Sequence, residues 1–212
     1  MPDAVTLLRE DHRTVEKLFK SFEKAGPNAR KTKARLVDGM VRELTIHASI
    51  EEQVFYPTVR HDARDLEPEV LEALEEHHVV KWLLSELDGM EPSAERFDAK
   101  VAVLIESVRH HVKEEEGDLF PAVRRAFGRQ ALVAMGDALA EAKKGAPVKP
   151  RPRMPDEPPS IDWPTRAPAP WIGPPARSRE RWPVAEGSAG RAMSHPKPEA
   201  TSRERLVPGS PS

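Results

Sequence analysis

The chain has 212 residues, with 33 Lys and Arg against 35 Asp and Glu, 22 prolines and no cysteine. The lack of cysteine excludes disulfides, zinc–thiolate sites and iron–sulfur clusters, so a bound metal would need histidine and carboxylate ligands. No stretch approaches the roughly 18 consecutive apolar residues of a membrane-spanning helix, and residues 1–10 lack the apolar core of a secretory signal. We therefore expect a cytoplasmic protein with no membrane partner.

Charge and proline are divided unevenly along the chain. Residues 1–145 carry 22 basic against 28 acidic side chains, whereas residues 146–212 carry 11 against 7, together with 16 of the 22 prolines. The second part has no periodic apolar face and cannot bury enough surface to fold. We predict a folded domain over residues 1–145 and a disordered Pro-rich tail over residues 146–212, which is a candidate docking segment for a protein partner. The acidic domain argues against a nucleic-acid partner.

The first part reads as almost entirely helical. Apolar residues recur every three or four positions, and Asp3 is suited to cap the first helix. The predicted helices cover residues 3–24, 29–60, 68–89, 93–121 and 129–144. Pro57 is expected to bend or stop the second helix, and the fourth is expected to end at Pro121. Four long helices with short connections predict an all-α, antiparallel up-down four-helix bundle, with the short fifth helix packed on its outside.

Histidine and glutamate interrupt the apolar stripes at matching places. His47 and Glu51 lie four residues apart, as do His111 and Glu115, and proline follows each histidine after ten residues. Residues at this spacing share one face of a helix. Each pair can therefore direct a nitrogen and a carboxylate to the same point in the core.

An internal repeat adds two more histidines. A shift of 64 residues places His47 on His111 and Glu51 on Glu115, and a shift of 65 places His12 on His77. The chain thus resembles two copies of one helical hairpin, each supplying a histidine and then a His-x3-Glu pair. The candidate metal ligands are His12, His47, Glu51, His77, His111 and Glu115.

Six ionisable groups in one bundle core would strongly destabilise the fold unless cations lay among them. Four imidazoles and two carboxylates suit iron, although the ligand types alone also admit zinc, manganese and copper. In the symmetric arrangement, His12 and His47 hold one ion, His77 and His111 hold the other, and both glutamates bridge. Coordination positions then remain for a solvent bridge and an external ligand.

At these residues the sequence resembles the hemerythrin-like, or HHE cation-binding, family. The resemblance covers residues 3–145 and is carried by Asp11-His12, His47-x3-Glu51 with Val54-Phe55-Tyr56-Pro57, Glu76-His77, and His111-x3-Glu115 with Leu119-Phe120-Pro121. It implies a four-helix bundle around two iron ions, a non-heme di-iron centre bridged by solvent or oxide. It also implies a function in binding, sensing or reacting with O2, peroxide or nitric oxide.

The sequence departs from the oxygen-carrying hemerythrins, which have a fifth histidine in an i, i+4 pair on the third helix. Here the residue four positions after His77 is Lys81 and the residue four positions before it is Ala73, so the fifth imidazole is missing. This difference favours peroxide chemistry or sensing over oxygen storage. It leaves open whether the protein is an enzyme, catalase-like or reducing peroxide or nitric oxide, or a redox or metal sensor that signals to a partner through its tail.

Neighbouring polar residues receive subsidiary roles. Glu16 is a minor candidate for an extra oxygen ligand or hydrogen-bond acceptor, and His61 is a loop histidine that could complete one metal site. Tyr56 is expected to pack in the core with its hydroxyl in water. Three further glutamates are expected to be solvated or to accept an imidazole N–H: Glu52, Glu114 and Glu116.

Overall fold

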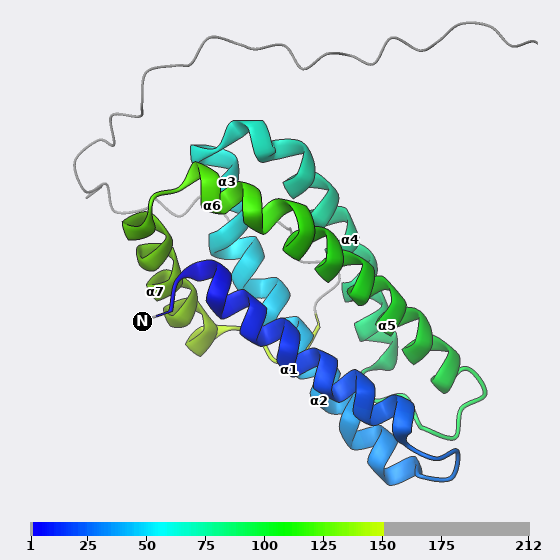
Figure 1. Ribbon diagram of the computed structural model, residues 1–212. Helices are drawn as coiled ribbons and strands as arrows, with labels where there is room; N and C mark the ends of the chain where they lie inside the picture. The colour runs from blue at the N-terminus through cyan, green and yellow to red at the C-terminus, as the bar shows by residue number, and fades with distance from the viewer. Residues whose placement is uncertain (1, 151–212) are drawn as a thin grey trace, which may run out of the picture. The chain divides into compact units, whose positions relative to one another are not determined.

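The computed structural model describes residues 2–150, and all regular secondary structure within that range is helical. Four long helices form two antiparallel hairpins, with α1 packed along α2 and α4 along α5 (Figure 1). Their bounds are α1 (Ala4–Lys24), α2 (Arg30–Ile50), α4 (Glu67–Leu87) and α5 (Phe97–Glu114). The predicted four-helix bundle is confirmed. The predicted disordered tail lies almost wholly outside the described residues.

Each half of the bundle contains a π-helical turn directly after its His-x3-Glu pair. The turn η1 (Glu51–Phe55) joins α2 to α3 (Tyr56–Asp62), and η3 (Glu115–Leu119) joins α5 to α6 (Phe120–Ala126). In both turns the closing backbone N–H, of Tyr56 or of Phe120, donates to a carbonyl five residues earlier. Such wide turns accommodate one extra residue and often occur at functional sites.

Neither proline ends the helical path on which it lies. Of the two effects predicted for Pro57, bending or stopping, stopping is therefore excluded, and the fourth helical path extends beyond its predicted end at Pro121. The helical path continues past Pro57 to Asp62 and past Pro121 to Ala126. Each proline lies in the first turn of a new α-helix, where its missing N–H has no required partner. A short 3-10 turn, η2 (Arg64–Leu66), then leads from α3 into α4.

The fifth helix, α7 (Arg129–Gly145), packs against the four-helix bundle with one apolar face. It buries Leu132, Met135 and Leu139 and contacts α1, α2 and η1. The contact with the start of α1 depends on a glycine, because a Cβ atom at Gly136 would lie 2.4 Å from the carbonyl oxygen of Pro2. The N-terminal segment and α7 accordingly lie side by side in Figure 1.

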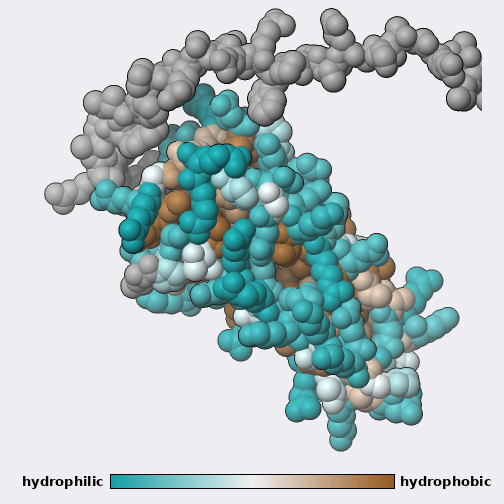
Figure 2. Space-filling model, viewed as in Figure 1, coloured by the Kyte–Doolittle hydropathy of each residue, from teal (hydrophilic) through white to brown (hydrophobic). Residues whose placement is uncertain are grey.

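The buried apolar side chains form two clusters, and the predicted site lies between them in sequence on each long helix. On α1, Leu8 belongs to one cluster and Val15 to the other, with His12 between them. On α2, Leu44 and Ile50 flank His47 in the same way. The bundle therefore has a polar layer within its apolar core. Most of the face in Figure 2 is hydrophilic, with apolar atoms visible in the furrows between helices.

Within residues 2–150, no helix combines the length and apolar character needed to cross a membrane.

Replacing Gly136 by Ala should destabilise the protein by about 1–3 kcal/mol, because the new methyl group would overlap backbone atoms of the N-terminal segment. Urea unfolding followed by circular dichroism would measure this. Gly145→Ala is the matched control, since a Cβ atom there meets nothing within 4 Å. Equal stability of the two variants would contradict the packing role assigned to Gly136.

Candidate metal centre

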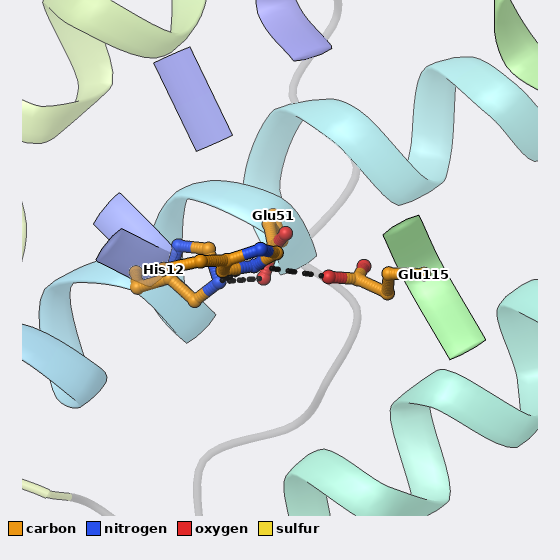
Figure 3. Close-up of side chains that lie close together, drawn as sticks. His12, Glu51 and Glu115 are labelled. Carbon is orange, nitrogen blue, oxygen red and sulfur yellow. Dashed lines mark hydrogen bonds and ion pairs between the residues drawn. The ribbon is translucent and has the colours of Figure 1, made fainter. Parts of the chain in front are cut away.

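The structure brings all six predicted ligand residues together in the core. Each is at most 5% exposed. They form two groups that share Glu51, and within each group one candidate ligand atom per residue lies within 4.8 Å of the others. The first group is His12, His47, Glu51 and Glu115; the second is Glu51, His77 and His111. Figure 3 shows His12, Glu51 and Glu115 converging from different helices.

The four imidazoles are arranged as two facing pairs. The Nε2 atoms of His12 and His47 are 3.1 Å apart, and so are those of His77 and His111. Each pair joins the two helices of one hairpin, α1 with α2 and α4 with α5. This is the pairing that the internal repeat predicted.

Glu51 lies between the two imidazole pairs. Its Oε2 atom is 3.1 Å from Nε2 of His47 and 3.4 Å from Nε2 of His77. Neither carboxylate oxygen makes a hydrogen bond within the described part of the chain, although the side chain is fully buried. A buried carboxylate without a hydrogen-bond partner is heavily penalised, so this position is suited to a cation.

Glu115 occupies the equivalent position in the other half. Its Oε2 atom is 3.3 Å from Nε2 of His12 and 3.6 Å from Nε2 of His111. Unlike Glu51, it has a hydrogen-bond donor: the hydroxyl of Tyr56 donates to Oε1 at 2.8 Å and lies 3.3 Å from Nε2 of His77. The expectation of a water-exposed Tyr56 hydroxyl was wrong, because the side chain is 1% exposed and its hydroxyl belongs to the site.

The counterpart of Tyr56 in the repeat is Phe120, which has no hydroxyl. Its ring stacks on His12 with centroids 5.7 Å apart and an interplanar angle of 6°. Tyr56 instead lies beside His77, at 5.3 Å between centroids. The two halves of the site therefore share a framework but differ by one hydrogen-bond donor.

Carboxylates also contact the outer nitrogens of the imidazoles. Nδ1 of His12 lies 2.9 Å from Glu116, and Nδ1 of His77 lies 3.1 Å from Glu52. These two contacts correspond to each other under the repeat, and each crosses from one hairpin to the other. The predicted role of both glutamates as acceptors fits this geometry.

The outer nitrogens of His47 and His111 face Asp11 and Glu76, the residues that directly precede His12 and His77. Nδ1 of His111 lies 2.7 Å from Glu76. Nδ1 of His47 faces Asp11 at 3.8 Å, beyond hydrogen-bond distance, because aspartate is one methylene shorter than glutamate. Asp11 also binds Lys143 of α7. Sequence analysis gave Asp11 and Glu76 no such role, although the repeat places them in equivalent positions.

These outer contacts determine where the imidazole protons lie. A carboxylate accepts hydrogen bonds only, so a neutral imidazole bound to it carries its proton on Nδ1 and its lone pair on Nε2. When His77 and His111 are both neutral, this directs two lone pairs at each other across 3.1 Å. Lone pairs at that distance repel unless a cation lies between or beside them. The donor arrangement therefore fits a metal ion.

The pKa values of the two buried carboxylates are shifted in opposite directions. Burial raises the pKa of Glu51 well above its usual range, and the nearby Glu115 raises it further. Burial alone would also raise the pKa of Glu115, but the imidazoles of His111 and His12 outweigh it and hold that pKa below its usual range. Burial lowers the pKa of His47 to about 4, which keeps its imidazole neutral. Neutral imidazole is the form that binds metal.

Three other predicted participants lie away from the centre. Glu16 forms a two-point ion pair with Arg109 on the surface, at 3.0 Å. His61 is exposed at the end of α3 and contacts Asp62. Glu114 pairs with His110 at 3.3 Å rather than with a core imidazole.

Lys81, four residues after His77, contacts the site through the Glu52 carboxylate. Its Nζ atom is 2.9 Å from Oε1 of Glu52, the residue that accepts from His77, and its side chain is nine-tenths buried. Lys81 thus holds the Glu52 carboxylate in position to accept from His77.

A small apolar cavity lies beside the four imidazoles. Its volume is about 20 Å³, which accommodates about one water-sized molecule. The remaining lining consists of apolar side chains from all four long helices: Val15, Leu44, Ala48, Val80, Val108 and Val112. The site therefore has space for about one small molecule beside the imidazoles.

Replacing Tyr56 by Phe should destabilise the chelator-treated, metal-free protein by about 1.5–3 kcal/mol, the range for a hydrogen bond to a charged group. The change removes a donor from Glu115 and leaves the ring in place. Urea unfolding in the presence of a chelator would measure the difference. Unchanged stability would show that the hydroxyl does not support Glu115.

Known proteins share this fold and sequence pattern. A DNA nickase from Nostoc sp. is 33% identical over 118 residues, which are 56% of this chain and 32% of that protein; the chain thus spans about a third of the length of that relative. An uncharacterized hemerythrin-like protein of Schizosaccharomyces pombe is 27% identical over 151 residues, covering 71% of this chain and 73% of the relative.

The crystal structure of a hemerythrin HHE cation-binding domain-containing protein from Mycobacterium kansasii superposes with a TM-score of 0.58 at 25% identity. The match covers 68% of this chain and 87% of that one. The family description "Hemerythrin HHE cation binding domain" matches residues 3–123, a range that contains all six candidate ligands. The chain belongs to the hemerythrin HHE cation-binding domain family.

Proposed function

We propose that the protein is a non-heme di-iron protein that binds, senses or reacts with O2, peroxide or nitric oxide. The observation that carries this proposal is the pair of Nε2–Nε2 contacts, each at 3.1 Å, with an unpartnered carboxylate oxygen beside them in a buried core. Iron accepts both imidazole and carboxylate ligands, which is the donor set present here.

In the proposed assignment, His12 and His47 bind one ion while His77 and His111 bind the other. Glu51 and Glu115 would hold both ions, since each carboxylate approaches one imidazole from each pair. When bound, the two ions would supply open coordination positions and redox equivalents for a small oxygen- or nitrogen-containing ligand.

The protein contributes orientation, exclusion of water and one hydrogen-bond donor. The outer carboxylates fix the tautomer of the imidazoles to which they hydrogen-bond and strengthen them as ligands. The apolar cavity has space for about one small molecule. Tyr56 places its hydroxyl beside Glu115 and His77 and donates a hydrogen bond to the Glu115 carboxylate.

Lys81 helps to distinguish oxygen storage from chemistry with peroxide or nitric oxide. It binds the acceptor of His77 and supplies no metal ligand, so the histidine set stays at four. Fewer protein ligands leave more positions for exogenous ones. This supports peroxide or nitric oxide chemistry, or sensing, ahead of oxygen storage.

Metal analysis of the purified full chain should find about two irons per molecule. The absorption spectrum should show near-ultraviolet charge-transfer bands that change when peroxide is added. Glu51→Ala and Glu115→Ala should each lower the iron content and the melting temperature, because metal-binding energy is folding energy in such a site.

Glu75→Ala is the matched control for these variants, since it removes an exposed glutamate from α4. Full iron content and an unchanged melting temperature in the Glu51 and Glu115 variants would show that these residues do not bridge. A protein that binds no iron under any condition would refute the proposed function as a whole.

Ala48→Val should weaken ligand binding without removing iron. The added methyl groups would occupy part of the 20 Å³ cavity, and about 1.4 kcal/mol of overpacking corresponds to roughly ten-fold weaker binding. Nitric oxide titration of the iron-loaded protein, with iron content measured in parallel, tests this. Unchanged affinity at full iron content would show that the ligand binds elsewhere.

A further inference from the structure

An acidic pocket between α4 and the α5–η3 segment leads to the proposed centre. Its volume is about 130 Å³, enough for several water molecules around an ion. Its inner wall includes His111 and Glu115, two of the proposed ligands. Outside them, five carboxylates line it: Glu69, Glu72, Glu76, Glu114 and Asp118. Among the described residues that line this pocket, none is Lys or Arg.

The inner end of the pocket carries an unpartnered buried acceptor. Glu115 is 2% exposed, and its Oε2 atom makes no hydrogen bond with any described residue. Because Glu115 lines the pocket, a cation that enters the pocket can approach this buried acceptor. The carboxylates of the wall therefore range from solvent-exposed ones to the buried carboxylate of Glu115.

Three residues at the mouth could hold a cation directly. Candidate ligand atoms of Glu76, His110 and Glu114 lie within 4.8 Å of one another. His110 is largely exposed, with Nε2 at 3.6 Å from Glu76 and 3.3 Å from Glu114. The other oxygen of Glu76 contacts Nδ1 of His111, so one carboxylate connects the mouth to a proposed ligand.

The groove on the other side of α5 has the opposite charge. It is a 570 Å³ groove between α1 and α5 whose lining includes five basic side chains and two glutamates. It ends at His12. A divalent cation is repelled there and attracted to the acidic pocket, because clefts lined by one sign of charge concentrate ions of the opposite sign.

We propose that the acidic pocket is the route by which divalent metal ions reach the centre, with Glu76, His110 and Glu114 as the first binding position. This inference rests on the proposed metal-binding function. It assigns Glu72 and Asp118, which contact no proposed ligand, a role in the rate of metal loading and none in the final metal content.

The test uses the full chain, stripped of metal, and ferrous iron added without oxygen. The measured quantity is the rate at which iron becomes resistant to a competing chelator. Glu72→Gln combined with Asp118→Asn should slow this rate on the order of ten-fold at low ionic strength, and added salt should reduce the difference. The final iron content should remain that of the unsubstituted protein.

Glu91→Gln combined with Glu95→Gln is the matched control. It removes the same formal charge from the loop between α4 and α5, at the opposite end of these helices. The control should load at the unsubstituted rate. If the pocket variant loads as fast as the control and reaches the same iron content, the route is wrong while the metal-binding function stands. If the unsubstituted chain takes up no iron, the proposed function itself fails.

A second measurement tests the mouth. Manganese(II), added in small amounts to the iron-loaded protein, should broaden the ring proton signals of His110 before those of His61, which is also exposed. Glu114→Gln should remove this preference. Equal broadening of the two histidines would overturn the first binding position.

Discussion

The structure depends on two buried carboxylates facing four imidazoles at one level of the bundle. Glu51 and Glu115 contact one imidazole from each hairpin, so the polar layer links α1, α2, α4 and α5 at a single place. Apolar packing on both sides holds this layer together despite its cost in desolvation. The free energy of unfolding therefore depends on whether a cation occupies this layer of the core.

Outside this layer, carboxylates that contact Nδ1 of the imidazoles orient the rings and direct Nε2 into the layer. Glu52, Glu76 and Glu116 each hold the outer nitrogen of one histidine, and Asp11 faces the fourth from farther away. The shorter aspartate and the Tyr56 hydroxyl are the two main departures from two-fold symmetry. Both make the proposed metal positions chemically different, even though their ligands come from repeated segments.

The bundle and the convergence of the six residues could be predicted because they depend on spacing alone. Stripes at steps of three and four place each histidine on the core face of its own helix, and the internal repeat aligns His12 with His77 and each His-x3-Glu pair with the other. The Tyr56 hydroxyl could not be placed in this way. Its position follows from the π-helical turn at Glu51–Phe55, which turns Phe55 fully into the core while Val54 is only partly buried. A regular helical period gives no sign of such a turn.

The π-helical turns also determine which changes in length the chain can tolerate. Deleting one residue of the turn other than Glu51 would let an ordinary α-helical turn replace the π-helical one, with the helix after it close to its present orientation. Tyr56 and Val59 would then keep their places in the core. A deletion in the regular part of α2 would instead rotate everything after it by about 100°, so single-residue changes in length should be tolerated better at Glu51–Phe55 than within the helices on either side.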